Sequence, residues 1–363
     1  MNKTIILLGA AALLLAGCGK DFFGARPGER ITFSARTTYK PATKTAYTGT
    51  VADGKELIAW VPGDQVRVFS GQAEHRYQAD RHDADYQVTA VTNNGHYSSA
   101  QVDHPGTAGT SGDRNGLVWG TGRHTFYGIY PSPAVNSDIS FDLATRTTTL
   151  ALPKAQTYIA AEQVLLPDMD YAYMYAGIAN VASGSRFTLA FQPMFTAFQF
   201  KVKAAVAPVV LKRFRLFSKA KAMTGSCTAT VSANADSEAS TATYSGFAGD
   251  REATLDFGSG IALALNEEIT FTVFALPQDF NDLSASFTVT KPDDSIEKTN
   301  TLALKYGATP PAGHAAGEFV TFPATLKHRI TCNVSPEFTN LIEVNAIQIA
   351  DWTDQGGTVI DIP

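Results

Sequence analysis

Side chains that could do chemistry are few in this sequence, and their spacing argues against a catalytic centre. Seven histidines are scattered along the chain: His75, His82, His96, His104, His124, His314 and His328. None belongs to a His-Glu-x-x-His zinc motif, and no Gly-x-Ser-x-Gly nucleophile elbow occurs. Residues 81–86, RHDADY, place two acids beside a histidine, a pattern more typical of a solvated hairpin tip. The sequence therefore predicts a non-enzyme without catalytic residues, metal ligands or cofactors.

The cysteine at position 18 closes a pattern that predicts lipidation. After the early cation Lys3, residues 5–17 form an uncharged apolar run, about the length of a signal-peptide core and too short to span a bilayer. The run ends in the letters LAGC, which resemble a bacterial lipobox. We expect a lipoprotein signal peptide at 1–17, an acyl chain such as palmitate on Cys18, and anchoring in the outer membrane. An ordinary secretory signal with an incidental cysteine is the alternative.

Two further cysteines, Cys227 and Cys332, leave two interpretations open. They could form a disulfide bond, because an exported protein meets an oxidising compartment. They could equally be two small buried thiols. No histidine stands near either of them at the spacing of a zinc site, so metal binding is not expected.

Length and composition exclude several classes of protein. The chain has 363 residues, enough for two domains. Only 17% of the residues are charged and the formal net charge is −5, which argues against a nucleic-acid partner. Hydrophobic residues make up 44% of the chain, which argues against disorder.

Along most of the chain, apolar and polar residues alternate with a period of two. Clear examples are residues 31–36, 187–192 and 198–203, while 271–275 are apolar on both faces, as in a strand buried on two sides. Clusters of Gly, Pro, Asn and Asp separate the runs, at 93–95, 131–133, 277–282 and 292–294. Long helical periodicity is missing. The pattern predicts an all-β protein built from sandwich domains.

The stretch from 57 to 68 is predicted to form a structural hairpin. An apolar run ends in Val-Pro-Gly-Asp, and a second run then alternates. Proline and Gly63 suit a tight turn, with Asp64 closing it. Trp60 is expected to fill a core, since a large aromatic side chain gains most from burial. Calcium binding by Asp64 is disfavoured because no cluster of oxygen ligands surrounds it.

A change in the residue pattern near Gly184 suggests a domain boundary. A tyrosine-rich stretch precedes this point and dense strand patterns follow it. We expect a lipidated segment with the first strand at 18–44, an N-terminal β-sandwich at 45–183 and a C-terminal β-sandwich at 184–363.

Four pieces of the chain together resemble the fimbrillin family of Bacteroidia, the lipoprotein pilins of type V fimbriae. In order they are ATKTAYTG, LIAWVPGDQVRVFS, FTLAFQPMFTAFQFKV and FALPQDF, and the resemblance covers nearly the whole mature chain. It implies two transthyretin-like β-sandwich domains in tandem. It also implies assembly in which a trypsin-like protease removes the N-terminal strand and a partner subunit supplies a replacement.

The resemblance places the proteolytic cut after Lys44, within ATKTAYTG. The family usually carries Arg at this position, so Lys44 departs from the pattern, and Arg36 is the second candidate. An uncleaved anchor-type subunit is the alternative reading.

The C-terminal segment 341–363 is the expected donor strand. Ile342 and Val344 alternate with polar residues, and Ile347 and Ile349 do so in the opposite phase, which predicts a bulge or a change of partner between the pairs. The same tail could instead close its own sandwich as a hairpin.

The sequence thus predicts a stalk or tip subunit of a cell-surface fimbria, made first as an outer-membrane lipoprotein and assembled with other pilin subunits. It does not reveal which host or bacterial surface ligand such a subunit would bind. The alternative is a surface glycan-binding lipoprotein of a polysaccharide-uptake system. That reading needs an exposed aromatic platform, for which Tyr171, Tyr173 and Tyr175 are the candidates.

Overall fold

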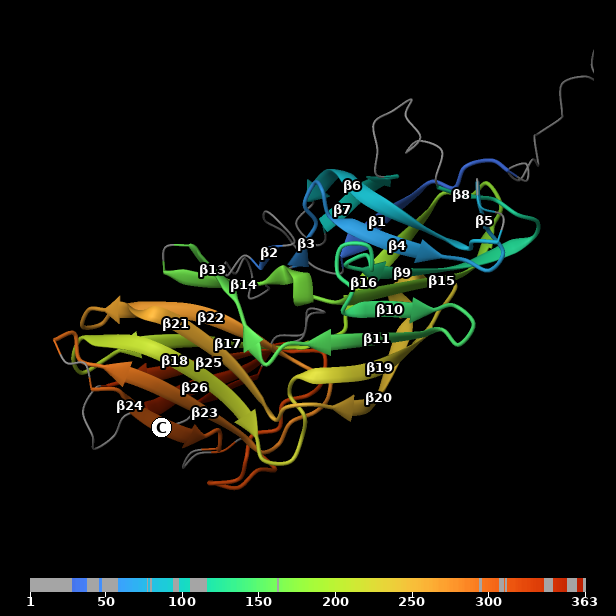
Figure 1. The fold of residues 1–363 in the computed structure, drawn as a ribbon. Coiled ribbons are helices and arrows are strands. Elements are labelled where there is room, and N and C mark those ends of the chain that lie inside the picture. The colour runs from blue at the N-terminus through green and yellow to red at the C-terminus, as the bar shows by residue number, and fades with distance from the viewer. Residues whose placement is uncertain are drawn as a thin grey trace, which may run out of the picture.

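Figure 1 shows an elongated molecule whose strands gather into two bodies, one toward each end. The computed structural model describes residues 28–37, 46–47, 58–76, 78, 80–93, 98–104, 116–161, 163–293, 296–306, 310, 312–335, 342–350 and 358–361. For 46–47, 58, 93, 342–350 and 358–361 it describes the backbone only. The all-β prediction is confirmed, because the helices within these ranges are two single 3-10 turns, η2 (Met169–Tyr171) and η3 (Ser237–Ala239).

The first body is built around a closed barrel. In order around the ladder its strands are β1 (Phe33–Thr37), β16 (Phe187–Pro193), β15 (Met174–Ala182), β9 (Arg123–Tyr130), β4 (Gln65–Phe69), β6 (Asp83–Asn93) and β7 (Ser98–Asp103). β1 runs parallel to β16 and antiparallel to β7, so it closes the ring. The period-two pattern of the sequence explains these strands, because it turns every second side chain into the barrel.

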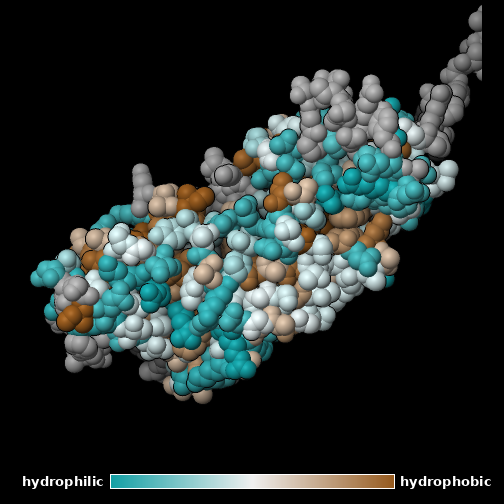
Figure 2. Space-filling model, viewed as in Figure 1, coloured by the Kyte–Doolittle hydropathy of each residue, from teal (hydrophilic) through white to brown (hydrophobic). Residues whose placement is uncertain are grey.

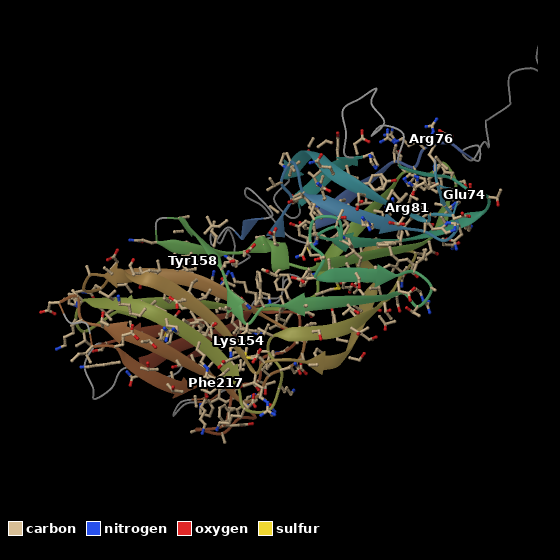
Figure 3. The ribbon with its side chains drawn as sticks, in the orientation of Figure 1. Glu74, Arg76, Arg81, Lys154, Tyr158 and Phe217 are labelled. Carbon is tan, nitrogen blue, oxygen red and sulfur yellow. The ribbon has the colours of Figure 1, made fainter. Side chains whose placement is uncertain are left out.

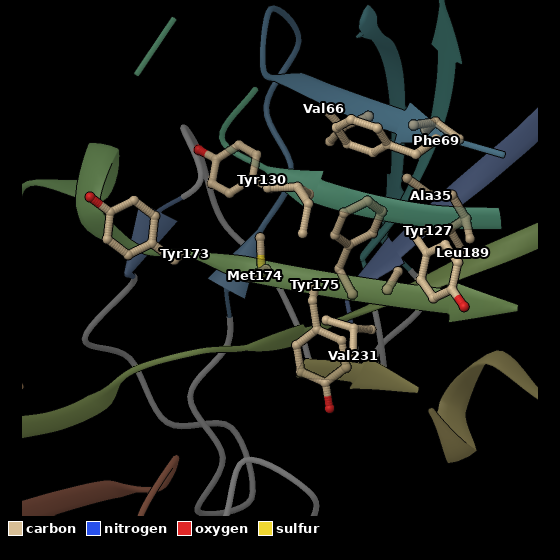
Figure 4. Packing of buried hydrophobic residues seen from close by; sticks show 14 of the residues in the cluster. Ala35, Val66, Phe69, Tyr127, Tyr130, Tyr173, Met174, Tyr175, Leu189 and Val231 are labelled. Atoms are coloured by element: carbon tan, nitrogen blue, oxygen red, sulfur yellow. The ribbon is translucent and has the colours of Figure 1, made fainter. Parts of the chain in front are cut away.

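A smaller sheet covers one side of the barrel. Its strands are β10 (Ile139–Asp142), β11 (Thr147–Leu152), β19 (Gly225–Ser232) and β20 (Thr241–Ala248). Ala229 and Val231 of β19 are buried in the same hydrophobic cluster as Trp60 and Phe126 of the barrel part. Figure 4 shows Val231 among the side chains of the barrel.

The second body consists of two sheets packed face to face. The five-stranded sheet has the order β12 (Ala155–Gln156), β21 (Glu252–Leu263), β18 (Val209–Ser218), β23 (Leu283–Thr290) and β24 (Lys298–Ala303) among the described residues. The seven-stranded sheet, counted in the same way, has the order β13 (Tyr158–Ala161), β14 (Val164–Pro167), β22 (Glu268–Ala275), β17 (Thr196–Ala204), β25 (Lys327–Val334), β26 (Ile342–Ala350) and β27 (Thr358–Asp361). The rings of Phe200 and Phe271 on one sheet meet Phe214 on the other at 4.5 and 4.8 Å between centroids.

The two bodies exchange segments of chain. Strands β19 and β20, from the second half of the sequence, complete the core of the first body. Strands β12 to β14, from the first half, join both sheets of the second body. Lys154, just before β12, forms ion pairs with Asp250 and Glu252 at this crossing (Figure 3).

The expected domain boundary between 183 and 184 lies too early. Strand β16 follows that point but pairs with β1 and β15 in the first barrel. Ala197 belongs to the first core and Phe198, the next residue of strand β17, to the second. The reason is that Gly184 marks only a turn between two neighbouring barrel strands, which look from sequence like the start of a new domain.

The predicted hairpin at 57–68 is wrong in its pairing, although its turn is present. The Asp64 N–H donates to the Val61 carbonyl at 3.0 Å, and Gly63 has φ +104°. However, β3 (Ile58–Ala59) pairs with β2 (Ala46–Tyr47), whereas β4 pairs with β6 and β9. The chain leaves one ladder and enters another because Trp60, between them, turns into the core.

The two remaining cysteines do not form a disulfide bond. Both thiols are free and buried. Cys227 lies in the core of the first body and Cys332 in that of the second, so the side chains have no common contact. Burial raises the pKa of Cys227 to about 12, which keeps this thiol protonated and unreactive near neutral pH.

Candidate functional site

Strand β1 closes the barrel of the first body. Its residues pair with β16 on one side, from Phe33 opposite Phe187 to Thr37 opposite Phe191. On the other side Ala35 stands opposite Ala100 of β7. Without β1, the barrel would present two adjacent strand edges with unpaired backbone N–H and C=O groups. We call the space that β1 fills the β1 slot.

The inward side chains of β1 are part of the core. Ile31, just before the strand, and Ala35 are 1% and 0% exposed, and Phe33 is 8% exposed. The ring of Phe33 stacks on Phe187 at 5.6 Å and meets Tyr86 edge-on at 4.8 Å. Figure 4 shows Ala35 and Leu189 close together inside the barrel. Removal of β1 would therefore expose apolar surface as well as backbone.

Polar contacts hold β1 at both of its ends. Arg30, ahead of the strand, forms an ion pair with Asp103 of β7, and Arg36 forms one with Glu238 of η3. The Ser34 and Thr188 hydroxyls lie 2.8 Å apart. These groups are partly exposed, so each ion pair adds little to the free energy of folding, and burial of the apolar side chains dominates.

A hollow of about 500 Å³ opens beside β1. It is lined by Thr32, Phe33, Ser34, Gln101, Val102, Arg186, Phe187 and Thr188. All of these belong to β1, the end of β7 and the start of β16, or directly precede a strand. The hollow therefore marks the end of the β1 slot that lies away from the second body, since β16 leads from it toward β17.

The two candidate cleavage residues differ in where they lie. Arg36 sits inside the ladder, opposite Ala190 on one side and Ser99 on the other. A protease of the trypsin type binds an extended segment, and Arg36 is already paired on both sides. Lys44 lies outside the described residues, as does the lipidation candidate Cys18.

The C-terminal candidates lie in β26, at one side of the seven-stranded sheet. Ile342 stands opposite Val334, Val344 opposite Cys332, Ile347 opposite Ile330 and Ile349 opposite His328. The register shifts between Val344 and Ala346, where the broken alternation predicts a bulge. β27 then pairs with β26 and forms the last strand of the sheet. The chain thus holds its own tail as a hairpin in this structure, and the burial of these four side chains lies outside what is described.

Trp60, Gly63 and Asp64 have a structural role. Trp60 is 2% exposed and meets Tyr130 and Phe191 edge-on at 5.4 and 5.1 Å. The Asp64 carboxylate accepts a hydrogen bond from the Val61 N–H at 2.8 Å. This bond fixes the turn.

The acids of RHDADY are ion-paired. Arg81 donates two bonds of 3.0 Å to Asp83, and Arg67 of β4 donates two of 2.8 Å to Asp85. Burial raises the pKa of Asp85, but hydrogen bonds from Arg67 and Ser132 outweigh it and hold that pKa below its ordinary value. Figure 3 shows Arg81 at the end of the first body far from the second.

The three tyrosines proposed as a glycan platform do not form one. Tyr173 and Tyr175 are 0% and 5% exposed. The Tyr173 hydroxyl donates to the Ala151 carbonyl at 2.6 Å, and the Tyr175 hydroxyl to the Gln192 side chain at 3.1 Å. Burial raises the pKa of Tyr175 to about 12. These rings pack in the core, so the observation on which the glycan reading depended is absent.

Sequence reasoning missed Asp103 and Glu238, the acids that hold β1. They are far from Arg30 and Arg36 in the chain. Closure of the barrel brings Asp103 to Arg30, and η3, between β19 and β20 of the covering sheet, brings Glu238 to Arg36. Among the residues the structure describes, no group of three His, Cys, Asp or Glu side chains is placed to hold a metal ion. No helix in the same ranges has the length and apolar character of a membrane span.

No family model matches the chain, and neither does any curated protein. Solved structures match it at low similarity. A candidate cell adhesion protein from Bacteroides ovatus is 16% identical, with 90% of this chain and 99% of that one covered and a TM-score of 0.45. Another, from Bacteroides uniformis, is 13% identical, with 89% and 98% covered and a TM-score of 0.46. The tip fimbrial protein Mfa3 from Porphyromonas gingivalis is 10% identical, with 89% and 99% covered and a TM-score of 0.41. These neighbours are fimbrial and cell-adhesion proteins of Bacteroidia. With TM-scores below 0.5, these similarities do not establish a role for this chain.

Proposed function

We propose that the protein is a structural subunit, stalk or tip, of a cell-surface fimbria, in which β1 is removed and a strand from another subunit refills the β1 slot. The observation that carries the proposal is the placement of β1 between β7 and β16, in a barrel that it closes. A strand near the start of the chain, joined to the rest by one linker, can be cut away without breaking the remaining topology.

The slot creates a strong preference for a replacement strand. Burial of a large apolar side chain such as Ile31 or Phe33 contributes about 1.5–3 kcal/mol. Each backbone group left buried without a partner costs about 1–3 kcal/mol. A donor strand with apolar residues at alternate positions would restore both contributions. Ordering and association costs reduce the net gain.

Cleavage of the chain after β1 would determine when strand exchange begins. While β1 is linked to its own barrel, its effective concentration at the slot exceeds that of any partner strand. Cutting the segment 38–45, which holds Lys40 and Lys44, would remove that advantage. The pairing of Arg36 on both sides favours Lys44 over Arg36 as the cleaved residue. The protease would be trypsin-like, as the family resemblance implies.

The donor in this proposal is the tail 341–363. β26 and β27 lie outermost on the seven-stranded sheet, so they can leave without opening the sheet in its middle. The subunit would first be held in the outer membrane by lipid on Cys18 and then pass into the fimbria. A transthyretin-like arrangement in each body belongs to the same proposal.

The test uses the secreted full chain carrying Cys18→Ala, with and without limited trypsin. SDS-resistant ladders should form after trypsin and not before. Lys40→Gln with Lys44→Gln should prevent both cleavage and ladder formation. Deletion of 341–363 should leave a folded chain that is cut but stays monomeric.

Two results would refute the proposal. One is a ladder of equal intensity in the uncut chain. The other is a ladder that persists in the tail deletion. If the deletion unfolds the second body, judged by circular dichroism, the tail is a permanent part of its own sheet and not a donor.

A further inference from the structure

Large hydrophobic side chains that stay exposed are rare here and unevenly placed. Among the described residues they are Val135, Ile159, Val206, Leu265 and Ile296, with exposed fractions from 51% to 65%. Three of these, Val206, Leu265 and Ile296, lie in turns at one end of the second body. We call these three residues the apolar tip.

The register of the strands shows that the three turns are neighbours. Val206 lies between β17 and β18, Leu265 between β21 and β22, and Ile296 between β23 and β24. Across the ladder, Val209 stands opposite Leu263, and Val210 opposite Thr290. The N–H of Asn266 donates to the Ala204 carbonyl at 2.7 Å, which ties the first two turns together.

This end of the second body faces away from the first. β17 enters from the first body at Thr196 and reaches the turn of Val206 only after Ala204. In Figure 2 the corresponding end of the molecule is mostly hydrophilic, with a small brown apolar area. Exposed apolar side chains gathered on neighbouring turns are typical of an interaction site.

The segment leading to the tail begins at the same end. β25 is parallel to β17, so Val334 stands opposite Ala204, and the chain proceeds from there toward β26. A tail that left its own sheet would therefore emerge beside the apolar tip. A partner that contacts the apolar tip would therefore lie where a released tail emerges.

The hollow beside β1 lies toward the opposite end of the molecule. The hollow beside β1 has Phe33 and Phe187 among its lining residues, with Arg186 as its charged residue. In sequence, the turns of the apolar tip carry four acids, Glu267, Asp293, Asp294 and Glu297, and one cation, Lys291. Five of the eight lining residues of the hollow are polar or charged, so the two surfaces are complementary in charge, and the apolar contact is limited to Phe33, Val102 and Phe187.

We propose that the apolar tip of one copy docks at the hollow beside β1 of a second copy. The proposal deepens the fimbrial role and rests on it, because the docked copy is the one whose tail would enter the slot. The contact joins different surfaces at opposite ends of the molecule, so it repeats along an open filament and does not close into a dimer. Three side chains and a hollow of about 500 Å³ make a small contact, weak alone, that orients the donor before strand exchange.

The test places a photo-crosslinking benzoylphenylalanine at position 206 of the full chain. The chain also carries Cys18→Ala, Lys40→Gln and Lys44→Gln, so that docking is observed without cleavage. An equal mixture of unlabelled and ¹⁵N-labelled chains is irradiated, and cross-links between the two isotopic forms are mapped by mass spectrometry. The expected cross-links reach peptides that contain Gln101 or Arg186 of the other copy.

Matched variants test whether the cross-links depend on the apolar tip. Leu265→Asp with Ile296→Asp should lower the yield of these cross-links at least about tenfold, since two apolar contacts are lost. Val135→Asp, an equally exposed apolar residue away from both ends, should leave the yield unchanged. Cross-links that map elsewhere, or an equal loss in both variants, would overturn the proposal.

The outcome is separable from that of the strand-exchange test. Ladders from the cut chain without these cross-links would remove the docking contact and leave the fimbrial role standing. Cross-links without ladders would support docking and count against strand exchange.

Discussion

The side-chain amide of Gln156 occupies the place of a strand residue beside Phe274. Its Nε2 donates to the Phe274 carbonyl at 2.7 Å, and its Oε1 accepts from the Phe274 N–H at 2.8 Å. β14 pairs with β22 only at Thr270 and Phe271, so the amide satisfies the backbone where the neighbouring strand has ended. One side chain from the first half of the sequence thus fastens β12 to the second body.

Gln156→Leu should lower the free energy of unfolding by about 2–4 kcal/mol, because two buried backbone groups lose their partners while the volume changes little. Urea denaturation followed by tryptophan fluorescence measures this. Lys154→Gln, which removes the partly exposed ion pairs with Asp250 and Glu252, should cost less, about 1 kcal/mol. Equal losses of unfolding free energy in both variants would show that the two hydrogen bonds of the Gln156 side chain contribute no more than the ion pairs of Lys154.

Phe33→Ala should weaken the hold of the barrel on β1. A buried Phe-to-Ala change costs about 3–5 kcal/mol. After cleavage at Lys44, the released N-terminal segment should leave the barrel faster than in the wild type, as size-exclusion chromatography of the cut chain would show. Thr32→Ala, an exposed neighbour, serves as the control. Retention of the segment to the same extent in all three chains would contradict the assigned role of Phe33.

Acid should destabilise the second body through His328. This side chain is fully buried against Phe198 and Phe322, and burial lowers its pKa to about 4, although a bond to the Pro323 carbonyl opposes the shift. The unfolded chain takes up this proton near pH 6.5, whereas the folded protein does so only near pH 4. The free energy of unfolding should therefore fall as the pH drops from 6.5 to 4, by up to about 3 kcal/mol from this residue.

His328→Gln isolates that contribution. The variant keeps a donor for the Pro323 carbonyl but does not titrate. Its free energy of unfolding, measured from pH 7 to pH 4, should fall less steeply than that of the wild type. Parallel curves for the two proteins would show that His328 is not the titrating group.

Cys18→Ala should abolish lipidation. Metabolic labelling with an alkyne fatty acid should tag the wild-type chain in cells and not the variant, because the lipid would be attached at Cys18. Cys227→Ala is the control and should label like the wild type. Equal labelling of the Cys18→Ala variant would rule out the lipobox interpretation.

The strands could be predicted from the sequence because their determinant is local. Alternation at 187–192 and 198–203 places β16 and β17 almost to the residue. The partners of each strand could not be predicted in this way. β4 follows a genuine turn at Gly63, yet pairs with β6 and β9, because burial of Trp60 decides the path of the chain and depends on residues far away in sequence.

At the candidate site too, the strand could be predicted from the sequence and its partners could not. The position of a first strand near 31–35 follows from its pattern, and β1 lies at Phe33–Thr37. Its position between β7 and β16 could not be predicted from the sequence, because it depends on closure of the barrel. The ion pairs of Arg30 and Arg36 could not be predicted either, because their partners are distant in the chain. The separation of Cys227 and Cys332 into different cores could not be read from spacing, since both sit in equally apolar strands.

The exchange of strands between the two bodies also constrains when the barrel can be finished during export. The first core needs β19 and β20, which end at Ala248. For a chain that crosses a membrane from its N-terminus, the apolar side of the barrel stays uncovered until that residue has emerged. Until then the early part of the chain would expose the apolar surface that this sheet later covers, and its first strand would be available before the barrel it closes is complete.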